Sequence, residues 1–573
     1  MTAPIEAVRN RDHAAALIGA LVTGGVRHAV ISPGSRNTPV VLALHALAKS
    51  GADLQLHSVL DERAAGFMAL GLSRACSGPV LLSCTSGSAG AHYLPAIIEA
   101  SHAHIPLIAL TADRPPELQG RGAPQTIDQS SLFGVHVRHT ICLEPPEADS
   151  PIPRLAGRRA IECAMGANTG PVHINAQYRK PLWHPLAPAT VDVGDAPAFK
   201  RPPLHLPDSE IQALSDRLMQ AKRGLFVWGP DPDPALDPTQ VLRLSSHLGW
   251  PILATPTSPA RFRANGQGHI ITASDAFLRS PHIAQALAPD LVIQLGGTPS
   301  SNALRALVGA APDVVAIDPR GVWRDPEHSL KTLLCADPEP IAHTLCSLLP
   351  ARETHTWLAQ WTAQEQRATQ ALSEACRDGW WSGSITRGVL DALPTGALLN
   401  TASSMPIRDL DGFGRGRRNA LHTTSSRGVN GIDGAVATTI GLARAWSSGP
   451  VAALMGDLTF LHDHSSLLLA RDLKQPVVVI VIDNGGGGIF SHLPISAHED
   501  AFEPWFLTPH SVDIPSLCTG AGVACTQVST MASLHAALRE ALDQSRLTVL
   551  HLPIDREDDL KRHRLAWTEA QRS

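Results

Sequence analysis

An acidic and an amide side chain follow two apolar runs near the carboxyl end of the sequence. Asp457 comes directly after the run PVAALMG, and Asn484 follows the run VVVIVID, 27 positions further on. Mg²⁺ takes oxygen ligands and is usually shared with substrate phosphates. Four glycines come after Asn484, so the main-chain carbonyl of Gly486 could be a third ligand, on a loop without side chains to obstruct a diphosphate. We therefore predict that Asp457, Asn484 and Gly486 hold Mg²⁺ and a diphosphate.

A guanidinium stands in a loop near the amino end. The stretch SPGSRNTP places Arg36 between the apolar run HAVI and an apolar helical pattern. Gly34 allows a tight turn and Ser35 can cap the next helix, so Arg36 would lie beside amides that favour an anion. An outward surface residue is the alternative. Comparable loops after apolar runs carry Arg114, Arg408 and Arg427.

The elements that position these residues are short apolar runs alternating with helix-like stretches. This rhythm is typical of parallel α/β sheets, in which ligands bind at the carboxyl ends of the strands. A Pro-rich passage at 184–207 and a less regular one from about 350 to 384 divide the chain. We predict three α/β domains, each a mainly parallel sheet flanked by helices, at residues 1–185, 205–350 and 380–573.

Composition excludes several classes of partner. The 573 residues carry a formal net charge of −5 with acidic and basic residues mixed, which favours neither nucleic acid nor an anionic membrane. The nine cysteines form no CxxC pair, the first residues lack an apolar leader, and the run VVVIVI is too short to span a bilayer. We expect a soluble cytoplasmic protein that acts on small molecules.

Several motifs resemble a known family. The Gly-Asp to Asn motif is similar to that of thiamine-diphosphate enzymes. The stretches SPGSRNTP, LDERAAGFMALGL, TSGSAGAHYLPAIIEA, TADRPPELQG, SSMPIRDLD, SSRGVNGIDG and GDLTFLHDHSS together resemble the 2-succinyl-5-enolpyruvyl-6-hydroxy-3-cyclohexene-1-carboxylate synthases of menaquinone biosynthesis. The resemblance covers the first and third segments nearly throughout, and the middle segment only in general pattern.

The resemblance implies a reaction and an assembly. Members of this family are transferases that decarboxylate 2-oxoglutarate on thiamine diphosphate and add the succinyl carbanion equivalent to isochorismate, releasing CO2. They use Mg²⁺, with Mn²⁺ as a possible substitute. Their first domain binds the pyrimidine, their third binds the diphosphate, and a Rossmann-like domain lies between these two in the sequence. The resemblance also implies a homodimer or a dimer of dimers with the sites at the subunit interface.

The same resemblance implies which residues hold the cofactor. A family Glu hydrogen-bonds the aminopyrimidine ring so that the 4′-imino group can remove the thiazolium C2 proton, and Glu62 matches it. Taken alone, Glu62 could instead be a first-turn acid that favours the helix dipole. Ile432 matches the aliphatic residue that wedges between the two cofactor rings. The cofactor residues so implied are Glu62, Gly431, Ile432, Asp433, Gly456, Asp457, Leu458, Asn484, Gly486 and Gly487.

Both substrates of the family are dicarboxylates, which gives the loop arginines a purpose. Arg holds a carboxylate through two parallel hydrogen bonds and stays charged when desolvated. Gln125 matches a catalytic residue that orients the second substrate or an intermediate, and Ile489 and Phe490 would line the pocket. The substrate residues so implied are Ser35, Arg36, Arg114, Gln125, Ser404, Arg408, Arg427, Ile489 and Phe490.

The chain departs from the family pattern at two places, and alternatives stay open. Asn302 stands where the family often carries Lys, and Arg305 could replace that charge. The motif DNGGGGIF differs from the more usual NNNGG form but keeps Asn484 and Gly486. The alternatives are another thiamine-diphosphate enzyme of 2-oxoacids, either a decarboxylase or an acetolactate-synthase-like carboligase, and a non-enzymatic relative. The last would be expected to lack Glu62 or a metal ligand.

Overall fold

The computed structural model describes residues 2–189, 191, 201–264, 266–352, 356–416 and 420–572. Three six-stranded sheets are present, and every strand pair in them is parallel. The predicted fold class is therefore confirmed. Of the two passages predicted to divide the chain, residues 190 and 192–200 of the first and 353–355 of the second lie outside the described residues.

The described residues fall into two compact units. The first unit comprises those of Met1–Pro202 and Ser426–Ala445, and the second those of Pro203–Ser425 and Trp446–Ser573. A short stretch of the third sequence segment thus belongs to the first unit. No helix among the described residues is both long and apolar enough to cross a membrane.

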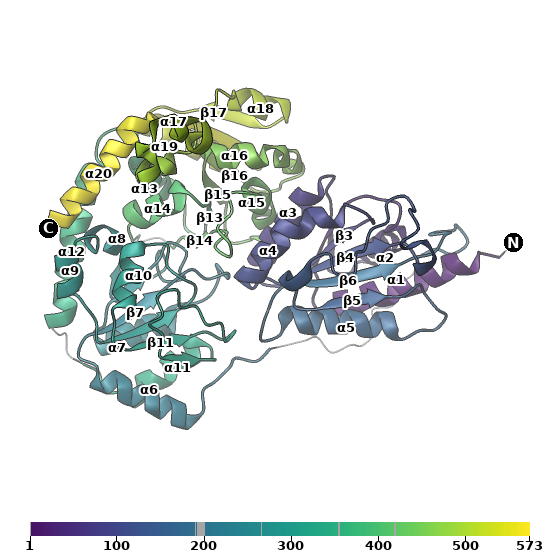
Figure 1. Ribbon diagram of the computed structural model, residues 1–573, viewed down its shortest axis with the longest axis horizontal. Helices are drawn as coiled ribbons and strands as arrows, with labels where there is room; N and C mark the ends of the chain where they lie inside the picture. Colours follow the sequence, from purple (N-terminus) through teal and green to yellow (C-terminus); the bar gives the residue numbers. More distant parts are fainter. Residues whose placement is uncertain are drawn as a thin grey trace. The chain divides into compact units, whose positions relative to one another are not determined.

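The sheet of the first unit has the strand order β2-β1-β3-β4-β6-β5. Helices α1, α2 and α5 pack on one face of this sheet, and in Figure 1 the sheet lies between α3 and α5. Residues of β3 and β4 are buried throughout, as expected of parallel strands covered on both faces. The strands are β1 (His28–Ile31), β2 (Gln55–Ser58), β3 (Val80–Cys84), β4 (Leu107–Asp113), β5 (Thr140–Leu143) and β6 (Val172–Gln177). The helices are α1 (Ile5–Thr23), α2 (Thr38–Lys49), α3 (Glu62–Cys76), α4 (Leu94–Ala103), α5 (Ile152–Met165) and α15 (Ala435–Ala445).

Helices α3 and α15 approach each other closely within the first unit. A Cβ on Gly71 would lie 2.1 Å from the carbonyl oxygen of Thr438, and one on Gly441 would lie 2.1 Å from that of Met68. Only glycine leaves room for backbone contact at these two positions. The helix pair therefore fixes α15 against the helix that begins at Glu62.

The second sheet, in the second unit, has the order β12-β11-β10-β7-β8-β9. Alternate residues of each strand point to opposite faces, so Leu225 and Val227 join one apolar cluster and Phe226 and Trp228 the other. Its strands are β7 (Gly224–Trp228), β8 (Ile252–Ala254), β9 (Ile270–Ile271), β10 (Leu291–Leu295), β11 (Val314–Ile317) and β12 (Thr332–Leu334). Its helices are α6 (Asp208–Gln220), α7 (Thr239–Leu248), α8 (Ser274–Phe277), α9 (Pro281–Ala286), α10 (Asn302–Gly309), α11 (Pro338–Leu348) and α12 (Thr356–Ala375).

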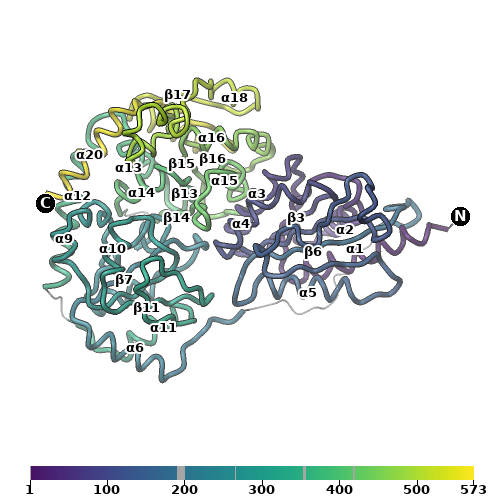
Figure 2. Tube along the Cα trace, viewed as in Figure 1, coloured from purple at the N-terminus to yellow at the C-terminus, as the bar shows by residue number. Residues whose placement is uncertain are grey.

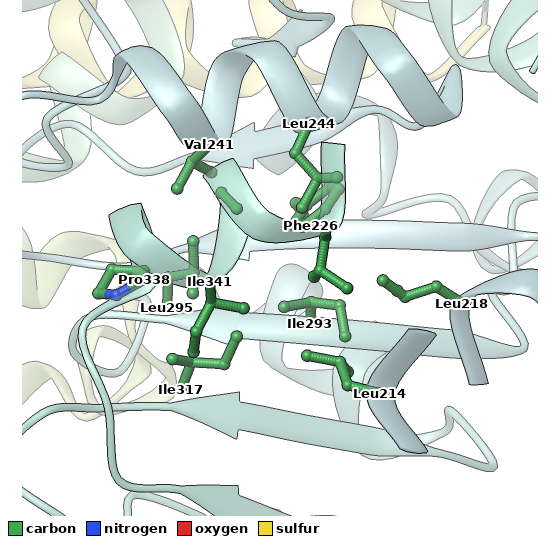
Figure 3. A pocket seen from close by; sticks show the side chains of 12 residues that line it. Leu214, Leu218, Phe226, Val241, Leu244, Ile293, Leu295, Ile317, Pro338 and Ile341 are labelled. Carbon is green, nitrogen blue, oxygen red and sulfur yellow. The ribbon is translucent and has the colours of Figure 1, made fainter. Parts of the chain in front are cut away.

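Figure 3 shows the cluster that side chains of α6, α7 and α11 form with those of the strands. Its lining is apolar, with Phe226, Ile293 and Leu295 from the strands facing Leu214 and Leu244 from the helices. The cavity left among these side chains is about 10 Å³, which is at the lower limit for a single water. This space is core packing rather than a ligand site.

The third sheet has the order β14-β13-β15-β16-β18-β17 and lies in the second unit too. Helices α12 and α20, far apart in the sequence, lie side by side (Figure 2). The strands are β13 (Leu398–Thr401), β14 (His422–Thr424), β15 (Val451–Gly456), β16 (Val477–Asp483), β17 (Ala524–Gln527) and β18 (Leu547–Pro553). The helices are α13 (Ser382–Ala392), α14 (Met405–Phe413), α16 (Asp457–Asp463), α17 (Glu499–Phe502), α18 (Ile514–Gly520), α19 (Met531–Leu542) and α20 (Arg556–Arg572).

A buried arginine links the second and third sheets. Arg261 donates to the carbonyl of Ala254 at 2.8 Å, and to those of Asp411 and Gly414 at 2.9 and 2.6 Å. The first of these carbonyls lies at the end of β8 and the other two lie at the end of α14. One guanidinium therefore hydrogen-bonds the ends of both elements. Both sheets thus lie in one compact unit and are connected by this side chain.

Candidate active site

An open pocket of about 530 Å³ lies at the carboxyl ends of the strands of the first sheet. Three loops form most of its walls: the turn at Pro33 to Ser35 after β1, the segment from Thr85 to Ala89 after β3, and Gln125 to Ile127. His92 and Glu62, the first residue of α3, complete the lining. Ser35, Glu62 and Gln125 all line it. The structure thus brings together three of the residues that the sequence singles out.

Glu62 reaches this pocket because its neighbour caps the helix. The Asp61 side chain accepts hydrogen bonds from the main-chain N–H of Arg63 at 2.9 Å and of Ala64 at 3.4 Å. Asp61 therefore stabilises the start of α3, which was the alternative role considered for Glu62. Glu62 is one of the residues that line the pocket.

Two predicted arginines converge beside the pocket. Arg36 is buried and donates to the carbonyl of Tyr178 at 2.8 Å, while its buried Nε has no hydrogen-bond partner among the described residues. Burial and the nearby charge of Arg114 lower the pKa of Arg36. Arg114 donates to the Ser86 hydroxyl and, at 2.7 Å, to the carbonyl of Gln125. A bound carboxylate would relieve the repulsion between the two cations.

Gln125 has a backbone conformation that a side chain disfavours. Its φ is 54°, in the left-handed region. Ser404, a predicted substrate residue of the second unit, has a φ of 73°. Strained residues of this kind concentrate at functional sites, because the surrounding structure must hold them. Gln125 and Ser404 are two of nine non-glycine residues with positive φ in the described part of the chain, so this conformation alone assigns no role to them.

A buried polar chain supports the pocket, and sequence reasoning missed it. The Gln129 side chain accepts from the Gly87 N–H at 2.8 Å and donates to Asn175 at 2.9 Å. Asn175 in turn donates to Asp113 at 2.9 Å, and Asp113 accepts from the N–H of Arg114 at 2.7 Å. These residues come from β4, β6 and a distant loop, so no local pattern in the sequence connects them. Their bonds fix the Gly87 loop and the base of Arg114.

The loop before α15 brings four further predicted residues into the first unit. Arg427, Gly431, Ile432 and Asp433 lie between Ser426 and the start of α15. A Cβ on Gly431 would lie 2.1 Å from a carboxylate oxygen of Asp433, so that side chain turns back over Gly431. The structure therefore groups these residues with Glu62, and the diphosphate motif lies in the other unit.

The predicted metal ligands meet in the second unit. Asp457 follows β15, is buried, and accepts from the N–H of Leu458 at 2.6 Å and of Gly486 at 2.8 Å. Asn484 follows β16, and its buried Oδ1 has no hydrogen-bond partner among the described residues. The Gly486 carbonyl accepts from the Gly488 N–H at 2.9 Å and keeps a second lone pair. The predicted Asp457, Asn484 and Gly486 therefore share one small region.

Two further side chains belong to this group. Ligand atoms of Asp457, Asp483 and His510 lie within 4.8 Å of one another. Nε2 of His510 lies 3.3 Å from Asp457, while His551 contacts Asp483 at 2.7 Å. Asp483 stands directly before Asn484, so the stretch DNGGGG could have indicated that Asp483 lies in this group. His510 and His551 come from distant segments without a local signal.

The two carboxylates titrate as a pair. Burial and the adjacent Asp483 raise the pKa of Asp457. Burial acts in the same direction on Asp483, but hydrogen bonds from His551, Asp457 and the Gly485 amide hold its pKa below the ordinary value. Two carboxylates in contact favour a shared proton or a cation between them. Together with the unpaired amide oxygen of Asn484, this donor set fits a hard divalent cation such as Mg²⁺ or Mn²⁺.

The remaining predicted residues lie in the second unit. Gly456 and Leu458 flank Asp457, and the N–H of Gly487 donates to the carbonyl of Leu507 at 2.6 Å. Arg408, on α14, is exposed and donates to the Ser404 carbonyl at 2.6 Å. Ile489 and Phe490 occupy a short 3₁₀ helix, Gly488–His492, which follows the four glycines.

Arg305, which could have replaced the family lysine, is engaged elsewhere. Its guanidinium lies 3.0 Å from the Glu327 carboxylate and 2.6 Å from the side-chain oxygen of Asn302. Both contacts of Arg305 are therefore with residues of the segment that contains the second sheet. The Arg305 charge is paired with Glu327 in this structure.

Family models match all three segments of the chain. The "Thiamine pyrophosphate enzyme, N-terminal TPP binding domain" matches residues 11–132 and the "C-terminal TPP binding domain" matches residues 412–552. The "Middle domain of thiamine pyrophosphate" matches residues 208–399. A solved structure, the benzoylformate decarboxylase from Polynucleobacter necessarius, has the same fold, with a TM-score of 0.72 at 17% identity over 95% of this chain and 98% of its own. Fold and site together define a thiamine-pyrophosphate enzyme.

Curated relatives narrow this class. The 2-succinyl-5-enolpyruvyl-6-hydroxy-3-cyclohexene-1-carboxylate synthase of Geobacillus kaustophilus is 37% identical over 98% of both chains. The synthases of the same name from Myxococcus xanthus and Chloroflexus aurantiacus are 38% and 36% identical, over 96% and 99% of this chain and 95% and 97% of their own. The chain belongs to the 2-succinyl-5-enolpyruvyl-6-hydroxy-3-cyclohexene-1-carboxylate synthase family.

Proposed function

We propose that this protein is a 2-succinyl-5-enolpyruvyl-6-hydroxy-3-cyclohexene-1-carboxylate synthase of menaquinone biosynthesis. It decarboxylates 2-oxoglutarate, adds the succinyl carbanion equivalent to isochorismate and releases CO2, which makes it a transferase. The observation that carries this proposal is the similarity to synthases of that name along nearly the full length of both chains. The pocket with Glu62, Gln125 and the two converging arginines supports it.

The residues of both units fit thiamine diphosphate and its cation. Asp457, Asn484 and Gly486 would hold Mg²⁺ or Mn²⁺, because they offer a carboxylate, an unpaired amide oxygen and a carbonyl. Gly456, Leu458 and Gly487 would lie beside the diphosphate, and the two glycines would leave room for it. When bound, thiamine diphosphate supplies the electron sink for the carbanion equivalent that decarboxylation leaves.

Glu62 would exchange a proton with the aminopyrimidine ring of the cofactor. Its carboxyl would hydrogen-bond the aminopyrimidine, and the Asp61 cap leaves it available for this role. Ile432 would pack between the two cofactor rings, with Gly431 and Asp433 shaping its turn. A proton exchanged at the Glu62 carboxyl is general acid–base catalysis through the cofactor.

The arginines would bind the carboxylates of the two dicarboxylate substrates. Arg36, Arg114, Arg408 and Arg427 would each supply planar donors in a site with little water. Ser35 and Ser404 would add hydroxyl donors, and Gln125 would orient the second substrate or an intermediate by hydrogen bonding. Ile489 and Phe490 would exclude water from the reacting atoms.

We further propose a homodimer, or a dimer of dimers, with the sites at the subunit interface. Each site would take Glu62 from one subunit and Asp457 from the other. A two-fold axis would then repeat the same contact at two equivalent sites. The nine cysteines, all of them free, support the cytoplasm as the compartment.

The direct test is an assay with purified protein. It contains 2-oxoglutarate, isochorismate, thiamine diphosphate and Mg²⁺, and follows the loss of isochorismate together with the mass of the product. We expect isochorismate to disappear only when 2-oxoglutarate is present. Pyruvate in place of 2-oxoglutarate should not support this loss of isochorismate. Turnover of pyruvate with isochorismate untouched would instead identify a decarboxylase or an acetolactate-synthase-like carboligase.

A further inference from the structure

The first unit contains a buried ion pair between α3 and α4. Arg74 and Glu99 approach to 2.8 Å, and their side chains are only 2% and 3% exposed. A buried pair adds little net stability, because desolvation offsets the attraction, whereas loss of one partner is strongly destabilising. Stability alone therefore gives little reason to keep two charges here.

The Glu99 carboxylate also holds the loop that precedes α15. One carboxylate oxygen accepts from the Gly428 N–H at 2.9 Å, and the other accepts from the Val429 N–H at 2.8 Å. A Cβ on Gly428 would lie 2.6 Å from the Glu99 carbonyl oxygen and 2.9 Å from the Ala103 nitrogen. Glycine therefore lets the loop backbone rest directly on α4. All these contacts lie within the first unit.

The loop held in this way carries site residues on both sides of the contact. Arg427 is the residue immediately before Gly428, and the turn with Ile432 follows three residues after Val429. The loop then enters α15, which the glycine contacts fix against α3. Glu62 begins that same α3. One small assembly of α3, α4 and this loop thus sets the backbone at Glu62, Arg427 and Ile432.

We propose that Glu99, itself oriented by Arg74, is a positioning residue for Arg427. Its carboxylate fixes the backbone from which the Arg427 guanidinium reaches a substrate carboxylate. A displacement of about 1 Å at a positioned group can lower a rate by about a hundredfold, so the seat of the loop matters for the reaction. This inference rests on the proposed function, because it acts through the role assigned to Arg427.

The test is a double-mutant cycle on the full-length holoenzyme. Steady-state kcat and KM for 2-oxoglutarate and for isochorismate are measured for wild type, Glu99→Gln, Arg427→Ala and the double variant. We expect Glu99→Gln to raise KM for one of these dicarboxylates about tenfold, with a smaller change in kcat. In the Arg427→Ala background the same substitution should change KM less than about twofold, since its effect passes through Arg427.

Two further variants keep the test decisive if Glu99→Gln folds poorly. Gly428→Ala leaves both charges in place and pushes the loop from α4, so it should reproduce the rise in KM. The pair Arg74→Gln with Glu99→Gln removes both charges and avoids an unpaired buried cation, and it should show the same KM effect with better stability. A matched control is Arg138→Met, since Arg138 donates to the Ser101 hydroxyl at 2.8 Å and thus holds α4 at another point. This control should lower the melting temperature without coupling to Arg427.

The outcomes separate this inference from the function on which it rests. If Arg427→Ala leaves both KM values unchanged, the role proposed for Arg427 is wrong. If Arg427→Ala raises KM and Glu99→Gln raises it further by its full factor in that background, the effects are independent. Glu99 would then be a structural residue only, and the positioning role is rejected.

Discussion

At the scale of single residues, the site relies on carboxylates whose surroundings differ. Asp61 caps α3, which leaves Glu62 to line an open pocket. Asp457 and Asp483 instead lie in contact, held by main-chain amides and by two histidines. Under the proposed function, the same type of side chain would hydrogen-bond a ring in one unit and hold a cation in the other. Environment, rather than residue type, separates the two roles.

Replacing Glu62 by Gln should abolish most of the activity. The amide keeps the size of the side chain but cannot exchange a proton, so we expect kcat to fall by about a hundredfold or more. Thiamine diphosphate should still bind with nearly unchanged affinity, measured by quenching of tryptophan fluorescence. Glu117→Gln, which changes an exposed carboxylate of the same unit, is the control and should behave as wild type. Wild-type turnover in Glu62→Gln would show that the assigned role is wrong.

Replacing Asp483 by Asn should weaken cation binding by the protein without cofactor. One of two adjoining carboxylates is lost, so we expect the affinity for Mn²⁺ to fall about tenfold, measured by the electron paramagnetic resonance of free Mn²⁺. The matched control is Asp472→Asn, because Asp472 is exposed and its φ of 61° suits Asn equally well. Equal Mn²⁺ affinities in Asp483→Asn and wild type would exclude Asp483 from the cation site.

At the scale of elements, one buried imidazole of α20 contacts two carboxylates of the second unit. His563 is fully buried, contacts the Asp409 carboxylate of α14 at 2.8 Å, and lies 3.5 Å from that of Asp559. Asp559 also accepts from the Ser382 N–H at 2.8 Å, where α13 begins. Three helices therefore meet at this charge, and His492 faces it from the segment after the glycines.

This contact makes the stability of the second unit depend on pH. Burial disfavours the charged imidazole, but Asp409 and Asp559 outweigh it and raise the pKa of His563 from 6.5 to about 9. Because the folded value lies above the unfolded one, the contribution is complete below pH 6.5 and is lost as pH rises through about 9. We expect His563 to contribute about 3 kcal/mol to the free energy of unfolding at pH 6, and nearly nothing at pH 10.

Urea unfolding of wild type and of His563→Gln, followed by tryptophan fluorescence, measures this contribution. The difference between the two midpoints should be largest near pH 6 and shrink steadily up to pH 10. Asp483 and Asp457 titrate in both proteins alike, so they cancel in the difference. A gap between the midpoints that stays constant over this range would contradict a charged His563.

At the scale of the whole molecule, the proposed dimer can be tested by mixing two inactive proteins. Glu62→Gln and Asp457→Ala affect residues of different units. A mixed dimer would hold one site with both lesions and one with neither, so part of the activity should return after subunit exchange. Mass spectrometry of the intact dimers establishes that exchange has occurred. No recovery of activity despite exchange, or an active protein that sediments as a monomer, would reject a shared site.

Much of the fold could be predicted because parallel strands covered on both faces appear as uninterrupted apolar runs. VVVIVID became β16 with only its final Asp483 less than fully buried. The proximity of Asp457 to the stretch that begins at Asn484 could be predicted, because Asp457 and Asn484 each directly follow such a strand. His510, His551 and the chain from Gln129 to Asp113 could not, since their partners come from distant segments. Neither could the grouping of residues 426–445 with the first unit, because an apolar helix does not specify which helix it packs against.

Because residues 426–445 belong to the first unit, a gene fragment for residues 1–202 would not encode that unit completely. A fragment that ends at residue 202 would encode the first sheet without α15, and would leave Gly71 and the surrounding surface of α3 facing water. It would also leave the Glu99 carboxylate without the hydrogen bonds that the N–H groups of Gly428 and Val429 donate to it in the intact chain. The first unit is therefore completed only after translation has passed residue 445. Its last helix is synthesised more than two hundred residues after the last strand of its sheet, and until then α15 cannot cover that surface of α3.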